Sequence, residues 1–187
     1  MKKTTFLASV LMFSFATAAS AHGPVRQKLK EDIKINAPAA KVWDIIKNFD
    51  DMSWLPPVAS VTAKGGNEKG ATRVLTLKSG GTIHEEMNKY DAEKMTYAYK
   101  ITELSTKETI THNGVEEKVP VLPVGNYAAD IQVTADGSGS VVSWKAGYYR
   151  AYMNNNPPQE MNEDAANNAV AAVFKAGLDN IKALAEK

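Results

Sequence analysis

The amino-acid sequence predicts an α+β fold in which a curved antiparallel sheet of about six to seven strands wraps around a long C-terminal helix. Two patterns in the chain predict this arrangement. From Val58 to about Tyr152, short alternating segments follow one another with turn residues between them. From about Asn162 to Ala185, apolar residues recur at helical spacing instead. Because the apolar face of a sheet and the apolar stripe of a helix must both be buried, the economical packing places the helix against the sheet.

Residues 1–21 are predicted to be a secretory signal peptide. Lys2 and Lys3 precede an apolar run over residues 6–15, and small residues fill positions 18–21. This order is typical of exported proteins. We therefore expect residues 22–187 to form a single domain in the periplasm. No later segment approaches the roughly 20 consecutive apolar residues of a transmembrane helix, so we expect no membrane span.

The composition argues against several classes of function. The chain has no cysteine, which excludes thiol catalysis and cysteine-ligated metal sites. Without Lys2 and Lys3, 20 of the 22 basic residues remain, against 21 acidic ones. This balance argues against binding to nucleic acid, because counterion release needs a concentrated basic patch and the sequence shows none.

The predicted domain begins with a strand that is followed directly by a helix. Leu29, Ile33 and Ile35 alternate with charged residues, as in a half-buried strand. Pro38 suits the first turn of the helix, and the apolar positions of that helix recur until Pro56-Pro57 stops the pattern.

The central part of the chain predicts an antiparallel meander. Four pairs of residues mark its turns: Gly65-Gly66, Gly80-Gly81, Asn113-Gly114 and Asp136-Gly137. The clearest strands start at Met95, Tyr127 and Val142, where apolar and polar residues alternate. The polar stretch 103–118 contains Asn113-Gly114, a strong hairpin signal, so we interpret this stretch as a hairpin inserted at the end of the sheet.

The last segment predicts a long amphipathic helix. Its apolar stripe consists of Ala166, Ala169, Val170, Val173, Phe174, Gly177, Leu178, Ile181 and Leu184. Asn162 is placed to cap the helix, and Glu163 and Asp164 in the first turn favour the helix dipole.

Several motifs, taken in order, carry a resemblance to a known family. In the first half they are Ile35-Asn36-Ala37-Pro38-Ala39-Ala40-Lys41-Val42-Trp43, Gly70-Ala71-Thr72-Arg73, and Gly80-Gly81 leading to Glu85. In the second half they are Leu122-Pro123-Val124 with Tyr127, Val142-Ser143-Trp144, and Ala176-Gly177-Leu178-Asp179-Asn180-Ile181. In this order they resemble the SRPBCC (polyketide cyclase/dehydrase-like) superfamily. The resemblance covers residues 29–185 and implies the START- and Bet v 1-like helix-grip fold, with a ligand cavity between the sheet and the final helix.

The predicted signal peptide, the start His22-Gly23-Pro24 and the segment 148–158 are similar to the periplasmic MxaD-type family of methylotrophic bacteria. This closer resemblance implies a role in methanol oxidation, in which the protein assists electron transfer between methanol dehydrogenase and its cytochrome c partner. An assisting protein acts through its surface. Tyr149, Arg150, Tyr152 and Met153 are the expected partner-contact residues, because aromatic residues, Met and Arg are enriched at protein interfaces.

A charged pair is expected on the inner face of the sheet. Arg73 and Glu85 lie on two strands joined by the Ser79-Gly80-Gly81 turn, and both share the parity of the apolar positions. We expect them to be diagonal cross-strand neighbours that face the ligand cavity. The pair either meets a polar group of a ligand or is a structural pair at the cavity mouth.

Five aromatic residues are further candidates for the wall of the cavity. They are Tyr97, Tyr99, Tyr127, Trp144 and Phe174. Ligand sites are mostly apolar walls with a few polar groups, although aromatic residues at this spacing also serve as plain core. Both interpretations stay open, and with them the alternative function as carrier of a small hydrophobic ligand.

No catalytic constellation is visible, so we expect that the protein is not an enzyme. The chain has no nucleophile elbow, and no His is placed beside a Ser. A cyclase or dehydratase that uses Arg73, Glu85 and a Tyr is the weakest alternative, because histidines are scarce. His22 with a free amine could chelate copper, but only His84 and His112 remain as further histidines, so no metal site and no cofactor are predicted.

Overall fold

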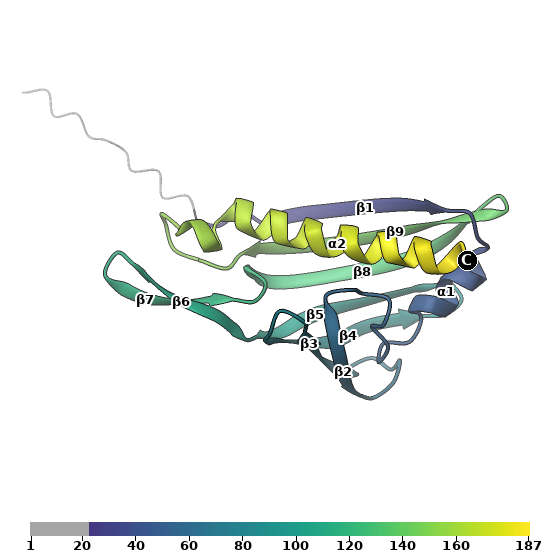
Figure 1. The fold of residues 1–187 in the computed structure, drawn as a ribbon, viewed down its shortest axis with the longest axis horizontal. Helices are drawn as coiled ribbons and strands as arrows, with labels where there is room; N and C mark the ends of the chain where they lie inside the picture. Colours follow the sequence, from purple (N-terminus) through teal and green to yellow (C-terminus); the bar gives the residue numbers. More distant parts are fainter. Residues whose placement is uncertain (1–22) are drawn as a thin grey trace, which may run out of the picture.

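The computed structural model describes residues 23–187, and Figure 1 shows their fold as a sheet with one long helix lying along it. The predicted signal peptide 1–21 and His22 lie outside the described residues. Seven strands form one sheet in the order β1-β9-β8-β5-β4-β3-β2, and every neighbouring pair is antiparallel. The predicted helix-grip fold is thereby confirmed, including its strand number and its long final helix.

The elements follow the chain in this order: β1 (Gln27–Ile35), α1 (Ala39–Ile46), β2 (Val58–Lys64), β3 (Thr72–Leu77), β4 (Thr82–Asp91), β5 (Thr96–Leu104), β6 (Thr106–His112), β7 (Val115–Pro120), β8 (Val124–Asp136), β9 (Gly139–Arg150), the short 3₁₀ helix η1 (Gln159–Met161) and α2 (Glu163–Ala185). None of the helices in residues 23–187 is long and apolar enough to cross a membrane.

Helix α2 forms where the apolar stripe predicts it. The Asn162 side chain accepts a hydrogen bond of 2.8 Å from the backbone N–H of Ala165, so it caps the helix as expected. In the middle of the stripe, the Phe174 ring is stacked on Trp144 of β9, with ring centroids 4.2 Å apart. This contact holds the helix against the sheet, and Figure 1 shows α2 beside β1 and β9.

The inserted polar stretch forms a hairpin of its own. Strands β6 and β7 pair with each other in a separate two-stranded sheet. Asn113 and Gly114 have positive φ angles of 52° and 78°, as a two-residue hairpin turn of this kind requires. At the tip, His112 Nε2 lies 2.8 Å from the carbonyl oxygen of Asn156, so the hairpin touches the segment before α2.

Two local expectations were wrong. Met95 was expected to open a strand, but it closes the turn before β5 with a φ of 48°, because this turn needs a residue in the left-handed region. Pro38 was expected inside the first turn of α1, but it is the residue that precedes that turn.

Candidate functional site

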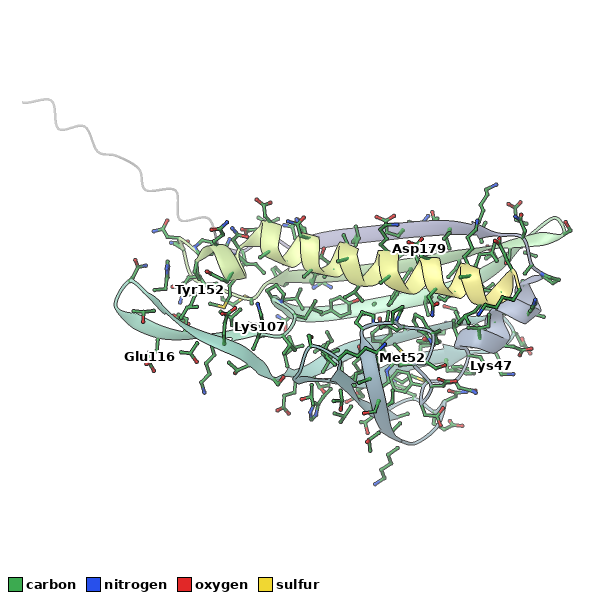
Figure 2. The ribbon with its side chains drawn as sticks, viewed as in Figure 1. Lys47, Met52, Lys107, Glu116, Tyr152 and Asp179 are labelled. Atoms are coloured by element: carbon green, nitrogen blue, oxygen red, sulfur yellow. The ribbon has the colours of Figure 1, made fainter. Side chains whose placement is uncertain are left out.

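The inner face of the sheet encloses a small cavity against α2. Its volume is about 50 Å³. The wall is formed by Met52, Leu55, Pro57, Val58, Leu75, Leu77, Ile83, Glu85, Tyr99, Ile101, Leu122, Tyr127, Trp144 and Val173; Met52 is labelled in Figure 2. The wall is therefore apolar apart from one carboxylate, two tyrosine hydroxyls and one indole N–H.

Arg73 and Glu85 form an ion pair in the core beside this cavity. They occupy directly opposite positions of β3 and β4, and not the diagonal positions that were expected, because the hairpin register pairs 73 with 85. Arg73 Nε donates to Glu85 Oε2 at 2.5 Å, and Arg73 Nη1 donates to the carbonyl oxygen of Phe49 at 2.9 Å. The guanidinium also lies 4.0 Å from the centre of the Phe49 ring. Both charged residues are buried, and Glu85 is the member of the pair that lines the cavity.

Burial governs the protonation of this region. Burial raises the pKa of Glu85 above its ordinary value, and the Arg73 guanidinium opposes that rise. Burial also raises the pKa of Tyr97 to about 12, and it raises the pKa of Tyr99 and of Tyr127 above the ordinary value. The tyrosine hydroxyls beside the cavity therefore keep their protons well beyond neutral pH.

The aromatic candidates fall into two groups. Tyr99, Tyr127 and Trp144 line the cavity, and Trp144 Nε1 donates to the Tyr99 hydroxyl at 3.2 Å. Tyr97 and Phe174 are buried away from it, since Tyr97 packs between neighbouring rings on the α1 side and Phe174 lies behind Trp144. Arg73 likewise stands behind Glu85 and outside the cavity wall.

Sequence reasoning missed the part of the wall that lies in irregular segments. Met52 and Leu55 precede β2, and Leu122 lies between β7 and β8. No strand or helix period marks these residues, so no periodic signal could have found them. The half-buried residues of the wall, here called the rim, are all apolar: Pro57, Val58, Leu77, Ile101 and Val173.

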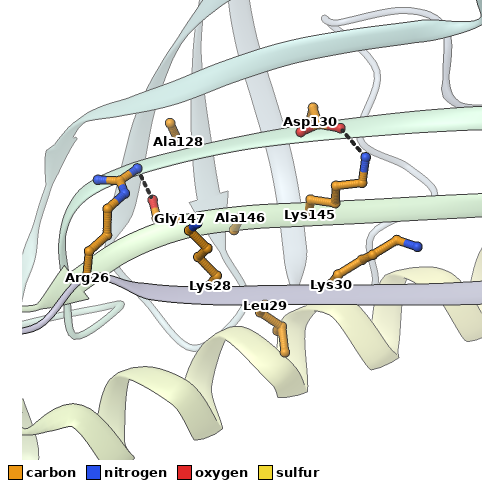
Figure 3. A pocket seen from close by; sticks show the side chains of 9 residues that line it. All are labelled: Arg26, Lys28, Leu29, Lys30, Ala128, Asp130, Lys145, Ala146 and Gly147. Atoms are coloured by element: carbon orange, nitrogen blue, oxygen red, sulfur yellow. Dashed lines mark hydrogen bonds and ion pairs between the residues drawn. The ribbon is translucent and has the colours of Figure 1, made fainter.

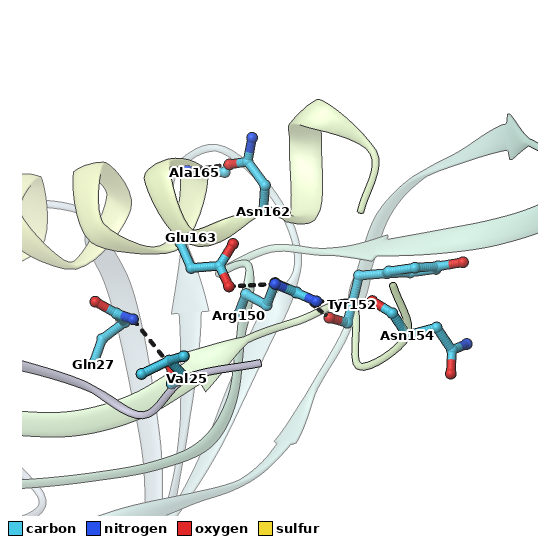
Figure 4. Close-up of polar contacts among 8 residues, drawn as sticks. All are labelled: Val25, Gln27, Arg150, Tyr152, Asn154, Asn162, Glu163 and Ala165. Atoms are coloured by element: carbon cyan, nitrogen blue, oxygen red, sulfur yellow. Dashed lines mark hydrogen bonds and ion pairs between the residues drawn. The ribbon is translucent and has the colours of Figure 1, made fainter. Parts of the chain in front are cut away.

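Arg150 was expected on the surface, and this expectation is wrong. Only 4% of the residue is exposed, because the chain after β9 folds back around the guanidinium. Arg150 Nε donates to the carbonyl oxygen of Tyr152 at 2.6 Å, Nη2 donates to that of Asn154 at 2.8 Å, and Nη1 pairs with the Glu163 carboxylate (Figure 4). Arg150 therefore ties the segment before α2 to the first turn of that helix.

The other three expected contact residues lie in different surroundings. Tyr149 is half-buried on β9, with the Arg26 guanidinium 5.5 Å from its ring centre. Tyr152 is half-buried and meets the His112 ring edge-on at 5.5 Å. Met153 is 49% exposed. Tyr152 and Met153 line a groove of about 440 Å³ between their segment and the β6–β7 hairpin.

Residues 26–186 match the protein family described as "Polyketide cyclase / dehydrase and lipid transport". No curated protein sequence matches the chain. Among solved structures, the protein XoxI from Bacillus cereus is similar with a TM-score of 0.65 and 23% identity, over 84% of this chain and 94% of that chain. A protein from Nitrosospira multiformis is similar with a TM-score of 0.62 and 19% identity, over 85% of this chain and 96% of that one. Ara h 8.0201 is similar with a TM-score of 0.60 and 15% identity, over 85% and 97% of the two chains. These likenesses establish the fold.

Proposed function

Because the chain belongs to the polyketide cyclase/dehydrase and lipid transport family, we propose that it binds and carries a small, largely apolar molecule with one hydroxyl group. The observation that carries this proposal is the Glu85 carboxylate in the wall of an otherwise apolar cavity. Apolar walls with a few placed polar groups are the usual composition of ligand sites.

The charge of the site favours a neutral ligand. Arg73 already balances the charge of Glu85 through a hydrogen bond to one carboxylate oxygen, so an ammonium ligand would bring an uncompensated charge into the core. A carboxylate ligand would meet Glu85 first, because Arg73 is not part of the wall. A hydroxyl donates one hydrogen bond to Glu85 and brings no charge.

The size of the cavity favours a narrow ligand. About 50 Å³ is far below the roughly 300 Å³ at which typical ligand pockets begin, so only a few heavy atoms fit inside. The rim, which includes Val58 and Val173, is apolar and half-buried, and this suits an alkyl chain that extends out of the cavity past these side chains. The proposed ligand is therefore a slender alcohol with its hydroxyl group at Glu85.

The test uses n-hexanol as the probe and the methyl resonances of the protein as the readout. We expect shifts at wall residues such as Leu75, Ile83 and Leu122. The Val173→Phe variant should lose binding because the larger ring closes the rim, whereas Val173→Ala should keep it. Near-ultraviolet circular dichroism of both variants checks the fold. The proposal fails if hexanol shifts no methyl group of the wall, or if both variants bind equally.

The place of action and the absence of catalysis are also part of the proposal. The charged, apolar and small-residue order of residues 1–21 supports export to the periplasm. The polar groups of the cavity wall are one buried carboxylate, two tyrosine hydroxyls with raised pKa values and an indole N–H. Binding is the role that this set supports best, because none of these groups is an activated nucleophile.

A second candidate function is that of an MxaD-type accessory protein, which assists electron transfer between methanol dehydrogenase and its cytochrome c. Exposed Met153 beside Tyr152 in the 440 Å³ groove favours it, because Met and aromatic side chains are frequent at interfaces. The test measures electron transfer between the two redox proteins with wild type, with Tyr152→Ala/Met153→Ala, and with Val115→Ala as an exposed control on β7. If wild type leaves the rate unchanged, the assignment fails. If only the double variant loses the effect, the groove carries it.

A further inference from the structure

The outer face of the sheet carries a shallow hollow on the side opposite to the cavity. Its volume is about 350 Å³. It is lined by Arg26, Lys28, Leu29, Lys30, Ala128, Asp130, Lys145, Ala146 and Gly147. Figure 3 shows Leu29 directed toward α2, whereas Lys28 and Lys30 lie on the other side of β1. Four cationic side chains thus surround the hollow, against one carboxylate.

The floor of the hollow is made by two small residues. Gly147 of β9 is directly opposite Lys28 of β1 on one side and Ala128 of β8 on the other. The Arg26 guanidinium lies over Gly147, where a Cβ atom would be only 2.7 Å from Arg26 Nη2, so the absence of a side chain at Gly147 makes room for this cation beside Lys28. The balanced overall charge concealed this grouping, because Lys145 and Gly147 are far along the chain from Arg26 and Lys28.

The arrangement also places like charges together. Lys30 and Lys145 are directly opposite each other, a pairing that destabilises a sheet. The charge of Lys30 is offset by Asp32, whose Oδ2 lies 2.6 Å from Lys30 Nζ. The charge of Lys145 is offset by Asp130, whose Oδ2 lies 3.7 Å from Lys145 Nζ. Arg26 donates to the carbonyl oxygen of Gly147 at 3.1 Å and lies over the Tyr149 ring, which extends the surface by one aromatic residue.

We propose that this hollow, with Arg26, Lys28, Lys30, Lys145 and Tyr149, docks an acidic segment of a partner protein. The cations are spread over the outer face of the sheet, with roughly 4.8 Å between strands and about 6.7 Å between Lys28 and Lys30 along β1. That spacing matches separate carboxylates along a polypeptide. A single phosphate would need cations that converge on one point, and it would lie close to the Asp130 carboxylate. This inference does not depend on the ligand that the cavity takes.

The experiment uses an oligo-glutamate peptide as the probe and the backbone amide chemical shifts of residues 23–187 as the readout. Shifts should gather on β1, β8 and β9 around the hollow. Binding should weaken about tenfold between about 20 and 200 mM salt, because exposed charges are screened. Lys28→Gln/Lys145→Gln should weaken it about tenfold as well, whereas the matched Lys107→Gln/Lys118→Gln pair on the β6–β7 hairpin should change it less than about twofold.

Three outcomes overturn the proposal. The first is shifts that scatter over the surface or gather elsewhere. The second is equal weakening by the two double variants. The third is tighter binding at the same amides by inorganic phosphate or by vesicles of anionic phospholipid than by the peptide, which would make the hollow a phosphate or membrane site.

Discussion

Arg73 and Glu85 face each other across strands β3 and β4, and the Nε atom of Arg73 lies 2.5 Å from Oε2 of Glu85 inside the core. The same guanidinium binds the carbonyl oxygen of Phe49, so it links the sheet to the segment that follows α1. Glu85 in turn presents the carboxylate to the cavity. This ion pair therefore contributes to the stability of the fold and also places the carboxylate of the proposed ligand site.

Breaking this pair should be costly. Arg73→Met leaves the Glu85 carboxylate buried without its partner, and the free energy of unfolding should fall by about 3 to 5 kcal/mol. The double variant Arg73→Met/Glu85→Leu should recover most of that loss, because no unpaired charge remains. Urea denaturation measures both. The partly exposed pair of Lys100 and Glu86 is the control, and Lys100→Met should cost less than about 1 kcal/mol because water screens this pair. Equal losses for Arg73→Met and Lys100→Met would contradict this account.

Gly177 should not tolerate a side chain. A Cβ atom at this position would lie 2.8 Å from the Trp144 ring and 3.0 Å from Leu55. Gly177→Ala should therefore destabilise the protein by about 1 to 3 kcal/mol, although alanine is the better helix former by about 1 kcal/mol. Ala183→Gly, at an exposed position of the same helix, is the control, because it measures the effect of helix propensity without a change in core packing. A stabilised Gly177→Ala variant in thermal unfolding would mean that α2 does not pack this closely.

Alkaline pH should unfold the protein through its buried tyrosines. The pKa of Tyr97 is raised from 10.0 to about 12 by burial, so the folded chain keeps this proton after the unfolded chain has lost it. Between these two values the unfolded chain binds fewer protons, and the free energy of unfolding falls as pH rises. Phenolate absorbance from the buried tyrosines should appear together with the loss of far-ultraviolet circular dichroism. Tyr97→Phe should make the fall in stability shallower. Phenolate formation at Tyr97 in the intact fold near pH 10 would refute the burial argument.

Arg150 should control the order of the segment before α2. In Arg150→Gln the hydrogen bonds to the carbonyl oxygens of Tyr152 and Asn154 and the ion pair with Glu163 are lost. Amides of residues 151–162 should exchange with deuterium at least about tenfold faster, since bonds to a charged group contribute about 1.5 to 3 kcal/mol each. Lys145→Gln on the same strand is the control. Unchanged exchange in Arg150→Gln would show that other contacts hold the segment.

The sequence predicted those parts of the fold that depend on repeating patterns. The helical stripe around Phe174 and the cap at Asn162 identified α2, and the shared parity of Arg73 and Glu85 identified the face on which they meet. Parity settles the face of a residue but not its partner, and the direct pairing of 73 with 85 depends on how the hairpin turn closes.

These patterns could not predict contacts between segments that are far apart in the sequence. Arg is a residue type that is frequent at interfaces, which is why Arg150 was expected to contact a partner. Its burial depends on how residues 151–163 fold back over it, and no local pattern shows this. Leu122 lines the cavity but lies in the connection between β7 and β8, where no strand or helix periodicity marks it. The basic hollow required the pairing of β1 with β9, which brings Lys30 opposite Lys145.

The most direct test of the proposed carrier function is the affinity of n-hexanol compared with its isomer methyl pentyl ether, which has the same number of heavy atoms but no donor. The wild-type protein should bind the alcohol at least about tenfold more tightly, because a hydrogen bond to a charged group contributes about 1.5 to 3 kcal/mol. In Arg73→Met/Glu85→Leu, which should stay folded, this preference should shrink to less than about threefold. Equal affinities of the wild-type protein for the two probes, or an undiminished preference in the double variant, would contradict the role of Glu85 as the ligand anchor.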